Sequence, residues 1–238
     1  MAHIKPDNYN RFLKKYSDLK GIDLLIADLN GVLRGKRIQT SALEKVFQEG
    51  LLLPASVFAG DITGATVEET GLGIAQGDSD RVCRPIPGTL SKSPWYKKSM
   101  AQVLMTMHEA DGNPFFADPR QVLTQIIDQF QESGFTAVVA VELEFYLLDI
   151  RRDRQKYPQP PISPITGKRD KNTQVYSVDD LDDYGEFLDQ VAKGAESQGI
   201  PADTALAEYA PGQFEINLKH EADPLSACDN AILLKRLI

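Results

Sequence analysis

The run FTAVVAVELEFYLLD, residues 135–149, constrains the fold more than any other stretch of the chain. Its length and its content of β-branched and aromatic residues predict a strand. Side chains alternate between the two faces of a strand, so one face here is apolar throughout and must pack on a core. The other face carries Glu142 and Glu144, whose positions are roughly 6.5–7 Å apart. The run therefore predicts a strand with one face in the core and two carboxylates on the opposite face.

Two carboxylates this close repel each other, and each loses hydration when it lies beside a core. Three arrangements would compensate for this cost. The face is solvated, basic side chains pair with the glutamates, or divalent cations bind them, because hard ions such as Mg²⁺ take oxygen ligands. The strand alone leaves all three open.

A second acidic pair lies in the run AEYAPGQFE, where Glu208 and Glu215 are seven residues apart. On a straight strand this odd separation would place them on opposite faces. Pro211 and Gly212 lie between them and predict a bend, in a broken strand over 205–218, that turns both carboxylates to one side. Two unrelated surface glutamates in a loop are the alternative.

The rest of the pattern predicts two domains divided near Ala117, the second of them built from α/β or α+β layers. Residues 1–117 are rich in predicted strands, and Asn30-Gly31 is a strong hairpin signal among them. Residues 118–238 alternate predicted helices and strands. The first of these helices runs from the N-cap Asp118 to Gly134 and carries an apolar stripe made of Val122, Leu123, Ile126, Ile127 and Phe130.

Composition limits the partners and the compartment. The net charge of −8 argues against a general nucleic-acid-binding face, because such a face must be basic. No apolar run reaches the length of a membrane span, and the first residues lack the apolar segment of a signal peptide. Cys83 and Cys228 have no metal-binding spacing, so we expect free thiols in a reducing cytoplasm. The basic, proline-rich stretch 151–174 is expected to be a solvated loop, with a subunit contact or a place near ATP phosphates as alternatives.

Four stretches, in this order along the chain, resemble the glutamine synthetase family: the Asn30-Gly31 hairpin, GNPFFADPRQVL (112–123), VELEFYLLD (141–149) and EYAPGQFEINLKH (208–220). The motif YAPGQFE and the loop YPQPPISPITG resemble sequences of the branch of the family that joins glutamate to amines such as putrescine. The resemblance implies an N-terminal β-grasp domain over 1–117. It also implies the beginning of a catalytic domain, with a curved antiparallel sheet and helices, over 118–238.

This resemblance implies an ATP-dependent carbon–nitrogen ligase. The γ-carboxylate of glutamate attacks the terminal phosphate of ATP, and ammonia or an amine then displaces phosphate from the γ-glutamyl phosphate. Two divalent ions, Mg²⁺ or Mn²⁺, would neutralise the reacting anions. Glu144, Glu208 and Glu215 match ligands of the first ion, and Glu142 matches one ligand of the second. The active sites would lie between subunits of a dodecamer-like homo-oligomer, with no nucleic-acid or membrane partner.

The chain departs from the family pattern in two places. The family's Phe-Asp-Gly-Ser-Ser segment, whose aspartate helps bind and deprotonate ammonium, corresponds here to VFAGDITG. Ala59 occupies the aspartate position, and Asp61, two residues later, is a candidate catalytic substitute unless the site takes an amine larger than ammonia. The family's later metal-binding and substrate-binding residues have no match before Ile238, and His220 does not fit the family's histidine motif.

The missing residues lead us to expect that the isolated 238-residue chain is inactive. Outside the ligases, the alternative is a family fold kept as a structural or regulatory protein. The clustered glutamates argue against that alternative. A two-metal hydrolase would need a nucleophile or histidine cluster, and the sequence offers neither.

Overall fold

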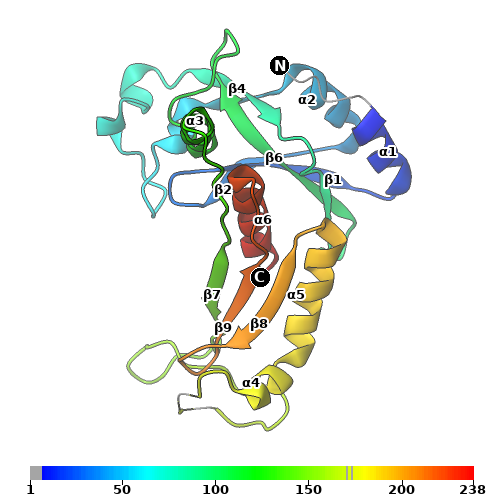
Figure 1. Ribbon diagram of the computed structural model, residues 1–238, viewed down its shortest axis with the longest axis vertical. Coiled ribbons are helices and arrows are strands. Elements are labelled where there is room, and N and C mark those ends of the chain that lie inside the picture. The colour runs from blue at the N-terminus through cyan, green and yellow to red at the C-terminus, as the bar shows by residue number, and fades with distance from the viewer. Residues whose placement is uncertain (1–6, 170, 173) are drawn as a thin grey trace. The chain divides into compact units, whose positions relative to one another are not determined.

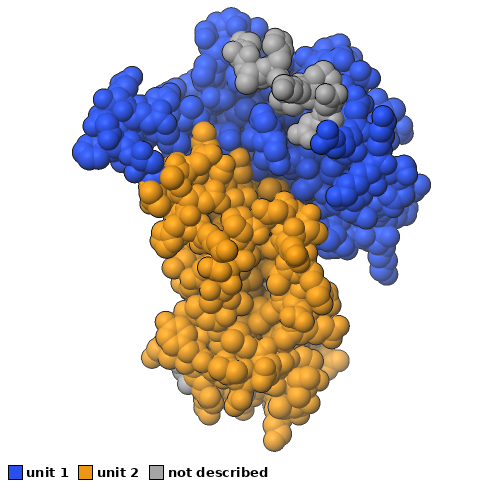
Figure 2. Space-filling view, turned by 45° about the vertical axis from the view of Figure 1, so that its right-hand side comes forward, with its two compact units in different colours: residues 1–137 blue, residues 138–238 orange. Residues whose placement is uncertain are grey.

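The computed structural model describes residues 7–169, 171–172 and 174–238. The chain forms two compact units, Met1–Ala137 and Val138–Ile238, each with its own sheet (Figures 1 and 2). This division falls after the first helix of the predicted second domain, whereas the boundary near Ala117 falls before it. The assignment of domains to 1–117 and 118–238 stays a prediction.

A mixed sheet forms the first unit. Its strands are β1 (Gly21–Ala27), β2 (Leu33–Ile38), β3 (Leu51–Pro54), β4 (Asp80–Pro85), β5 (Ser91–Ser93) and β6 (Met100–His108). The strand order is β2-β1-β6-β4-β3, and β5 also pairs with β6. The central pair, β1 and β6, is parallel, and the other pairs are antiparallel. Both central strands are nearly continuous apolar runs, as strands inside a sheet usually are.

One core cluster holds this unit together. Ile22, Leu24 and Ile26 of β1 pack with alternate residues of β6, and with Leu43 and Val46 of helix α2 (Leu43–Glu49). Helix α1 (Asp7–Lys15) contributes Tyr9. The remaining short elements are the 3-10 turns η1 (Thr40–Ala42), η2 (Ala55–Phe58), η3 (Glu68–Thr70) and η4 (Ile74–Gln76).

The predicted hairpin at Asn30-Gly31 is confirmed, but its turn spans more than two residues. The buried carboxylate of Asp28 accepts hydrogen bonds from the N–H groups of Asn30 and Val32 and from the Arg34 guanidinium, each at 2.9 Å. Gly31 has a φ of 66°, which glycine adopts without steric cost. A buried side chain therefore organises this turn.

Helix α3 (Pro119–Glu132) begins at the predicted cap. One carboxylate oxygen of Asp118 accepts a hydrogen bond from the N–H of Arg120 at 2.9 Å. The other accepts from Thr106 Oγ1 and from the N–H of Met107, each at 2.7 Å. Asp118 is only 2% exposed, so it both caps the helix and joins it to β6.

Replacing Asp118 should destabilise the folded chain. Asp118→Ala is expected to lower the free energy of unfolding by about 2–4 kcal/mol, because it removes a helix cap and leaves the N–H of Met107 without its acceptor. Urea unfolding at neutral pH measures the change. Asp118→Asn keeps one acceptor oxygen and should lose less; equal losses in the two variants would contradict the double role.

A three-stranded antiparallel sheet forms the second unit. Its strands are β7 (Glu142–Tyr146), β8 (Ala202–Ala207) and β9 (Gln213–Leu218), in the order β7-β9-β8. The helices are α4 (Val178–Asp183), α5 (Gly185–Gln198) and α6 (Pro224–Leu237). Helices α5 and α6 approach closely at Gly194, where an added Cβ would lie 2.6 Å from Cδ1 of Leu237.

Two strand predictions were wrong in extent. The strand predicted over 135–149 is regular only from Glu142 to Tyr146, because its partner β9 is short and pairs only with that part of the run. The run 205–218 is a hairpin of two strands and not one broken strand. Gly212 lies in its turn with a φ of 77°, and a Cβ there would lie 2.5 Å from Cδ of Pro161.

Cys83 and Cys228, both among the described residues, form no disulfide. Burial raises the pKa of the Cys83 thiol to about 12, whereas Cys228 is exposed. We expect iodoacetamide at pH 8 to alkylate Cys228 at least about 100-fold faster than Cys83 in the folded chain. Mass spectrometry of timed samples checks this, and comparable rates would contradict the burial of Cys83.

Candidate active site

Strand pairing brings the carboxylates of the second unit onto one face. In the antiparallel pair β7–β9, Glu144 lies opposite Glu215, and Glu142 lies opposite Asn217. Residues that lie directly opposite each other point to the same side of a sheet. The glutamates of VELEFY therefore share a face with Glu215.

The hairpin adds the fourth carboxylate. Leu206 lies opposite Glu215, and the N–H of Glu208 donates to the carbonyl of Gln213 at 2.8 Å, which continues the same pairing. Glu208 thus lies on the face that carries Glu215, although the two are seven residues apart. They reach one side because Glu208 directly follows β8 and continues its pairing with β9, and not because one strand bends.

The other face of this sheet is apolar and fixes the orientation of the carboxylates. Phe214 of β9 is 1% exposed and packs with Phe145 and with Tyr184. Phe145 also contacts Phe187 of α5, with the ring centroids 6.0 Å apart. Aromatic burial of this size holds the strands so that Glu142, Glu144 and Glu215 face away from Tyr184 and α5.

Glu215 is the electrostatic centre of the acidic face. It is 8% exposed, and burial raises the pKa of its carboxyl above its ordinary value. The neighbouring charges of Glu142, Glu208 and Glu144 raise this pKa further. Glu142 and Glu144 are themselves more accessible, so solvation accounts for those two. Around Glu215 a hydrogen bond from the Asn217 side chain lowers the pKa and offsets only part of the increase that burial and the neighbouring charges cause.

Amides, and not basic side chains, contact the acidic face. Nε2 of Gln213 donates to Oε2 of Glu144 at 2.7 Å, and Nδ2 of Asn217 donates to Oε1 of Glu142 at 3.3 Å. Within the described ranges, no lysine or arginine forms an ion pair with the four glutamates. Sequence reasoning missed these amides, although positions 213, 215 and 217 are polar and alternate with apolar neighbours.

The acidic face has the donor chemistry of a divalent-metal site. It has a surplus of hard oxygen acceptors, including the buried Oδ1 of Asn217, which has no hydrogen-bond donor among the described residues. In the side-chain positions described, however, no three acidic, histidine or cysteine side chains converge closely enough to hold an ion. Glu142 and Glu144 would have to turn away from their amide partners to do so.

Asp61 has a local role within the first unit. Its Oδ1 accepts hydrogen bonds from the N–H and Oγ1 of Thr63, at 2.8 and 2.7 Å, and from the N–H of Ala65 at 3.0 Å. The hydrogen bond from the Thr63 hydroxyl is the main cause that lowers the pKa of Asp61. Ala59 is buried and His220 is exposed beyond the end of β9.

One residue of the basic, proline-rich loop, Pro161, lies against the hairpin turn beside the acidic face. Arg169 forms an ion pair with Asp149 and donates to the carbonyl of Pro160, and Pro161 contacts Gly212. Hydrogen bonding from the N–H of Arg151, and then from Arg169, lowers the pKa of Asp149. Arg169 of this basic stretch therefore stabilises the conformation of the loop itself.

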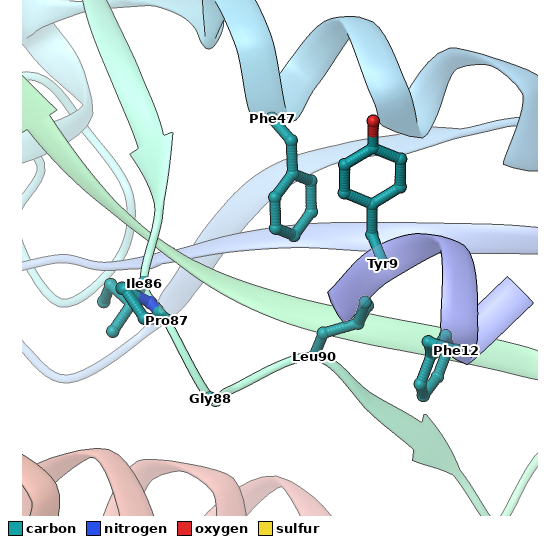
Figure 3. A pocket seen from close by; sticks show the side chains of 7 residues that line it. All are labelled: Tyr9, Phe12, Phe47, Ile86, Pro87, Gly88 and Leu90. Atoms are coloured by element: carbon teal, nitrogen blue, oxygen red, sulfur yellow. The ribbon is translucent and has the colours of Figure 1, made fainter. Parts of the chain in front are cut away.

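A separate pocket of about 110 Å³ lies in the first unit between α1, α2 and the segment after β4 (Figure 3). Tyr9, Phe12, Phe47 and Leu90 line it, with Ile86, Pro87 and Gly88. It is smaller than the roughly 300–1,000 Å³ of most small-molecule sites, and no charged side chain lines it. The acidic face is therefore the better candidate for catalysis.

Comparison with known proteins decides the family. The family model described as glutamine synthetase, catalytic domain, matches residues 116–238, which are just over half of the chain. The chain belongs to the glutamine synthetase family. This confirms the predicted catalytic-domain fold in its coarse form, a sheet with helices.

The relatives of this glutamine synthetase-family chain include enzymes that act on amines. It is 49% identical to gamma-glutamylputrescine synthetase PuuA of Escherichia coli over 228 residues, 96% of this chain and 48% of that protein. It is 30% identical to glutamate–isopropylamine ligase of a Pseudomonas species, over 94% of this chain and 48% of that protein. A solved structure described as a novel glutamine synthase homolog matches with a TM-score of 0.76 at 19% identity, over 92% of this chain and 47% of that one. The chain spans about half the length of the relatives it matches.

No helix among residues 7–169, 171–172 and 174–238 combines the length and the apolar character needed to cross a membrane.

Proposed function

We propose that this chain supplies one half of an ATP-dependent ligase that joins the γ-carboxylate of glutamate to an amine. The observation that carries the proposal is the set of four carboxylates on one face of the β7-β9-β8 sheet, centred on the buried Glu215. Glu144, Glu208 and Glu215 would hold a first divalent ion, and Glu142 a second. The ion, Mg²⁺ or Mn²⁺, would supply charge neutralisation for two anionic reactants.

The residues of this chain would do the positioning. The aromatic packing of Phe145 and Phe214 holds β7 and β9 in register, so the carboxylates stay on one side. Gln213 and Asn217 donate hydrogen bonds to Glu144 and Glu142, and these two carboxylates would have to leave their amide partners to hold an ion. The remaining metal ligands, and the groups that bind ATP and glutamate, would correspond to the half of the relatives that has no counterpart in this chain.

An amine larger than ammonia is the favoured second substrate, and putrescine is the specific candidate. The names of two relatives specify an amine, and the nearer one shares 49% identity. In addition, the buried Ala59 has no carboxylate to bind ammonium. Asp61 as a catalytic substitute remains part of the ammonia alternative.

We further propose that the first unit is the family's β-grasp domain, and that subunits form a dodecamer-like ring in the cytoplasm with active sites between them. The parallel central pair β1–β6, with antiparallel neighbours and α2 packed on the sheet, supports the β-grasp assignment. Under this proposal the 238-residue chain alone has no activity, because it spans only about half the length of the ligases it matches.

ADP release by the longest native form of the gene product tests the proposal. Each reaction contains ATP, Mg²⁺ and glutamate, with putrescine in one and ammonium in the other. Release that depends on glutamate and putrescine supports the proposed ligase, and release with ammonium would make it a glutamine synthetase. No release in either reaction, together with no thermal stabilisation by Mg²⁺ or Mn²⁺, would favour the structural or regulatory alternative.

A further inference from the structure

The loop that follows η2 in the first unit folds as a small closed turn. Gly60 and Thr66 form an antiparallel bridge at its base. Further along, the N–H of Asp61 donates to the carbonyl of Ala65 at 2.9 Å. Residues 60–66, which we call the 60–66 loop, are therefore a short hairpin with a defined tip.

Asp61 stabilises the tip from within. Its Oδ1 accepts hydrogen bonds from the N–H and the hydroxyl of Thr63 and from the N–H of Ala65. The side chains of Asp61 and Thr63 are thus used inside the turn. Ile62 lies between these two residues, and its side chain is 73% exposed. The loop therefore presents an apolar side chain at its tip.

The turn between β1 and β2 holds the 60–66 loop in place. Nδ2 of Asn30 donates to the carbonyl of Gly60 at 2.9 Å. Arg34 lies beside the same loop, because a Cβ added to Gly60 would lie 3.7 Å from Nη2 of Arg34. The buried Asp28 accepts hydrogen bonds from both the N–H of Asn30 and Nε of Arg34. The tip of the loop is therefore preorganised by contacts that begin at a buried carboxylate.

The place of Ile62 in the sequence distinguishes it from other exposed apolar residues, which are common on protein surfaces when they occur singly. The run FAGDI corresponds to the family's Phe-Asp-Gly-Ser-Ser, so Ala59 stands at the aspartate and Ile62 at the last serine. Two polar positions of the segment whose aspartate binds ammonium in the family are therefore apolar in this chain. Ala59 is 1% exposed, so Ile62 is the one of the two that a substrate can contact.

We propose that Ile62 contacts the carbon chain of the amine and sets the preference for amines longer than ammonia. Ile62 has this role only if the proposed function holds, with an amine as the second substrate. Ammonia has no carbon atoms to place, whereas each methylene group of a longer amine gains free energy from contact with an apolar side chain. In a hydrophobic pocket one methylene group changes kcat/KM about 10–200-fold.

A series of primary amines tests this role in the longest native form of the gene product. Glutamate-dependent ADP release is measured with ammonium, methylamine, propylamine and putrescine, and kcat/KM is compared along the series. Ile62→Ser is expected to lower kcat/KM for putrescine at least about 10-fold, through a higher KM for the amine. The value for methylamine should change less than about twofold, and the KM values for ATP and glutamate should stay the same, because the ammonium end and the other substrates do not contact Ile62.

Two further variants serve as controls. Ile62→Leu keeps an apolar side chain of the same size and should retain kcat/KM for putrescine within about threefold. Ile74→Ser is the matched control, because Ile74 is also 73% exposed in the first unit, on η4, and this change should affect no amine.

Three results would overturn the proposal while the unmodified enzyme is active. They are an equal loss for every amine in Ile62→Ser, which would assign Ile62 to the folding of the loop; no loss for putrescine; and an equal loss in Ile74→Ser. If the unmodified enzyme releases no ADP with any amine, the proposed function itself fails, and the role of Ile62 fails with it. The unmodified enzyme therefore separates the two kinds of failure.

Discussion

Glu144→Ala is expected to lower kcat of the complete ligase at least about 100-fold, by analogy with the loss of one preorganised charge-stabilising group. Glu144 lies opposite Glu215 at the centre of the acidic face, and Gln213 holds its carboxylate at 2.7 Å. Alanine removes a proposed ligand and leaves the strand pairing intact, since the side chain lies outside the apolar core. Glutamate-dependent ADP release in the presence of putrescine and Mg²⁺ measures the effect.

Tyr146→Phe is the matched control for this substitution. Tyr146 lies on the same face of β7, two residues along, and is exposed. The control should change kcat less than about threefold, because it leaves all four carboxylates in place and removes a single hydroxyl group from an exposed side chain. ADP release by Glu144→Ala close to that of the unmodified enzyme would remove Glu144 from the proposed site.

Glu215→Gln should have two opposite effects on stability. Without metal it should raise the free energy of unfolding at neutral pH. The pKa of Glu215 is raised in the folded chain, so folding favours the protonated form and the charged form is destabilising. Stability from this group falls as the pH rises through the raised pKa, and a neutral glutamine removes that loss.

With metal bound, the unmodified chain should be more stable than Glu215→Gln. Mg²⁺ or Mn²⁺ at a hundredfold excess over Kd should stabilise the unmodified chain by about 2.7 kcal/mol, or raise its Tm by about 5–10 °C. Glu215→Gln should lose most of this rise. Thermal unfolding with EDTA and with added metal measures both effects in the 238-residue chain.

Glu196→Gln makes the same chemical change on the exposed side of α5, outside the acidic face. It should keep the full metal-dependent rise and show no gain in EDTA. If Glu215→Gln and Glu196→Gln behave alike in both conditions, the acidic face is not a metal site.

Those features of the site that depend on local geometry could be predicted from sequence. Alternation along a strand is a property of the backbone, so the shared face of Glu142 and Glu144 followed from their spacing. The caps of α3 were likewise predicted, because Asp118 and Gly134 act through their own neighbouring backbone groups.

Features that depend on a distant partner could not be predicted in the same way. The spacing of Glu208 and Glu215 predicted a bend only if both lay on one strand, whereas Glu208 directly follows β8 and Glu215 lies on β9. Their shared face follows from pairing, which a separation of seven does not encode. The length of β7 depends on which residues of β9 lie opposite it, and the sequence of β7 alone does not encode that.

The hairpin that joins Glu208 to Glu215 also determines which insertions and deletions the acidic face can tolerate. Opposed residues of a hairpin share a face whatever the length of the connecting turn, so residues can be added between Glu208 and Gln213 without separating the carboxylates. One residue inserted between Gln213 and Glu215 would shift the register and point Glu215 into the aromatic core. Length variation among lineages of this sequence is therefore expected in the turn, while β9 keeps its residue count.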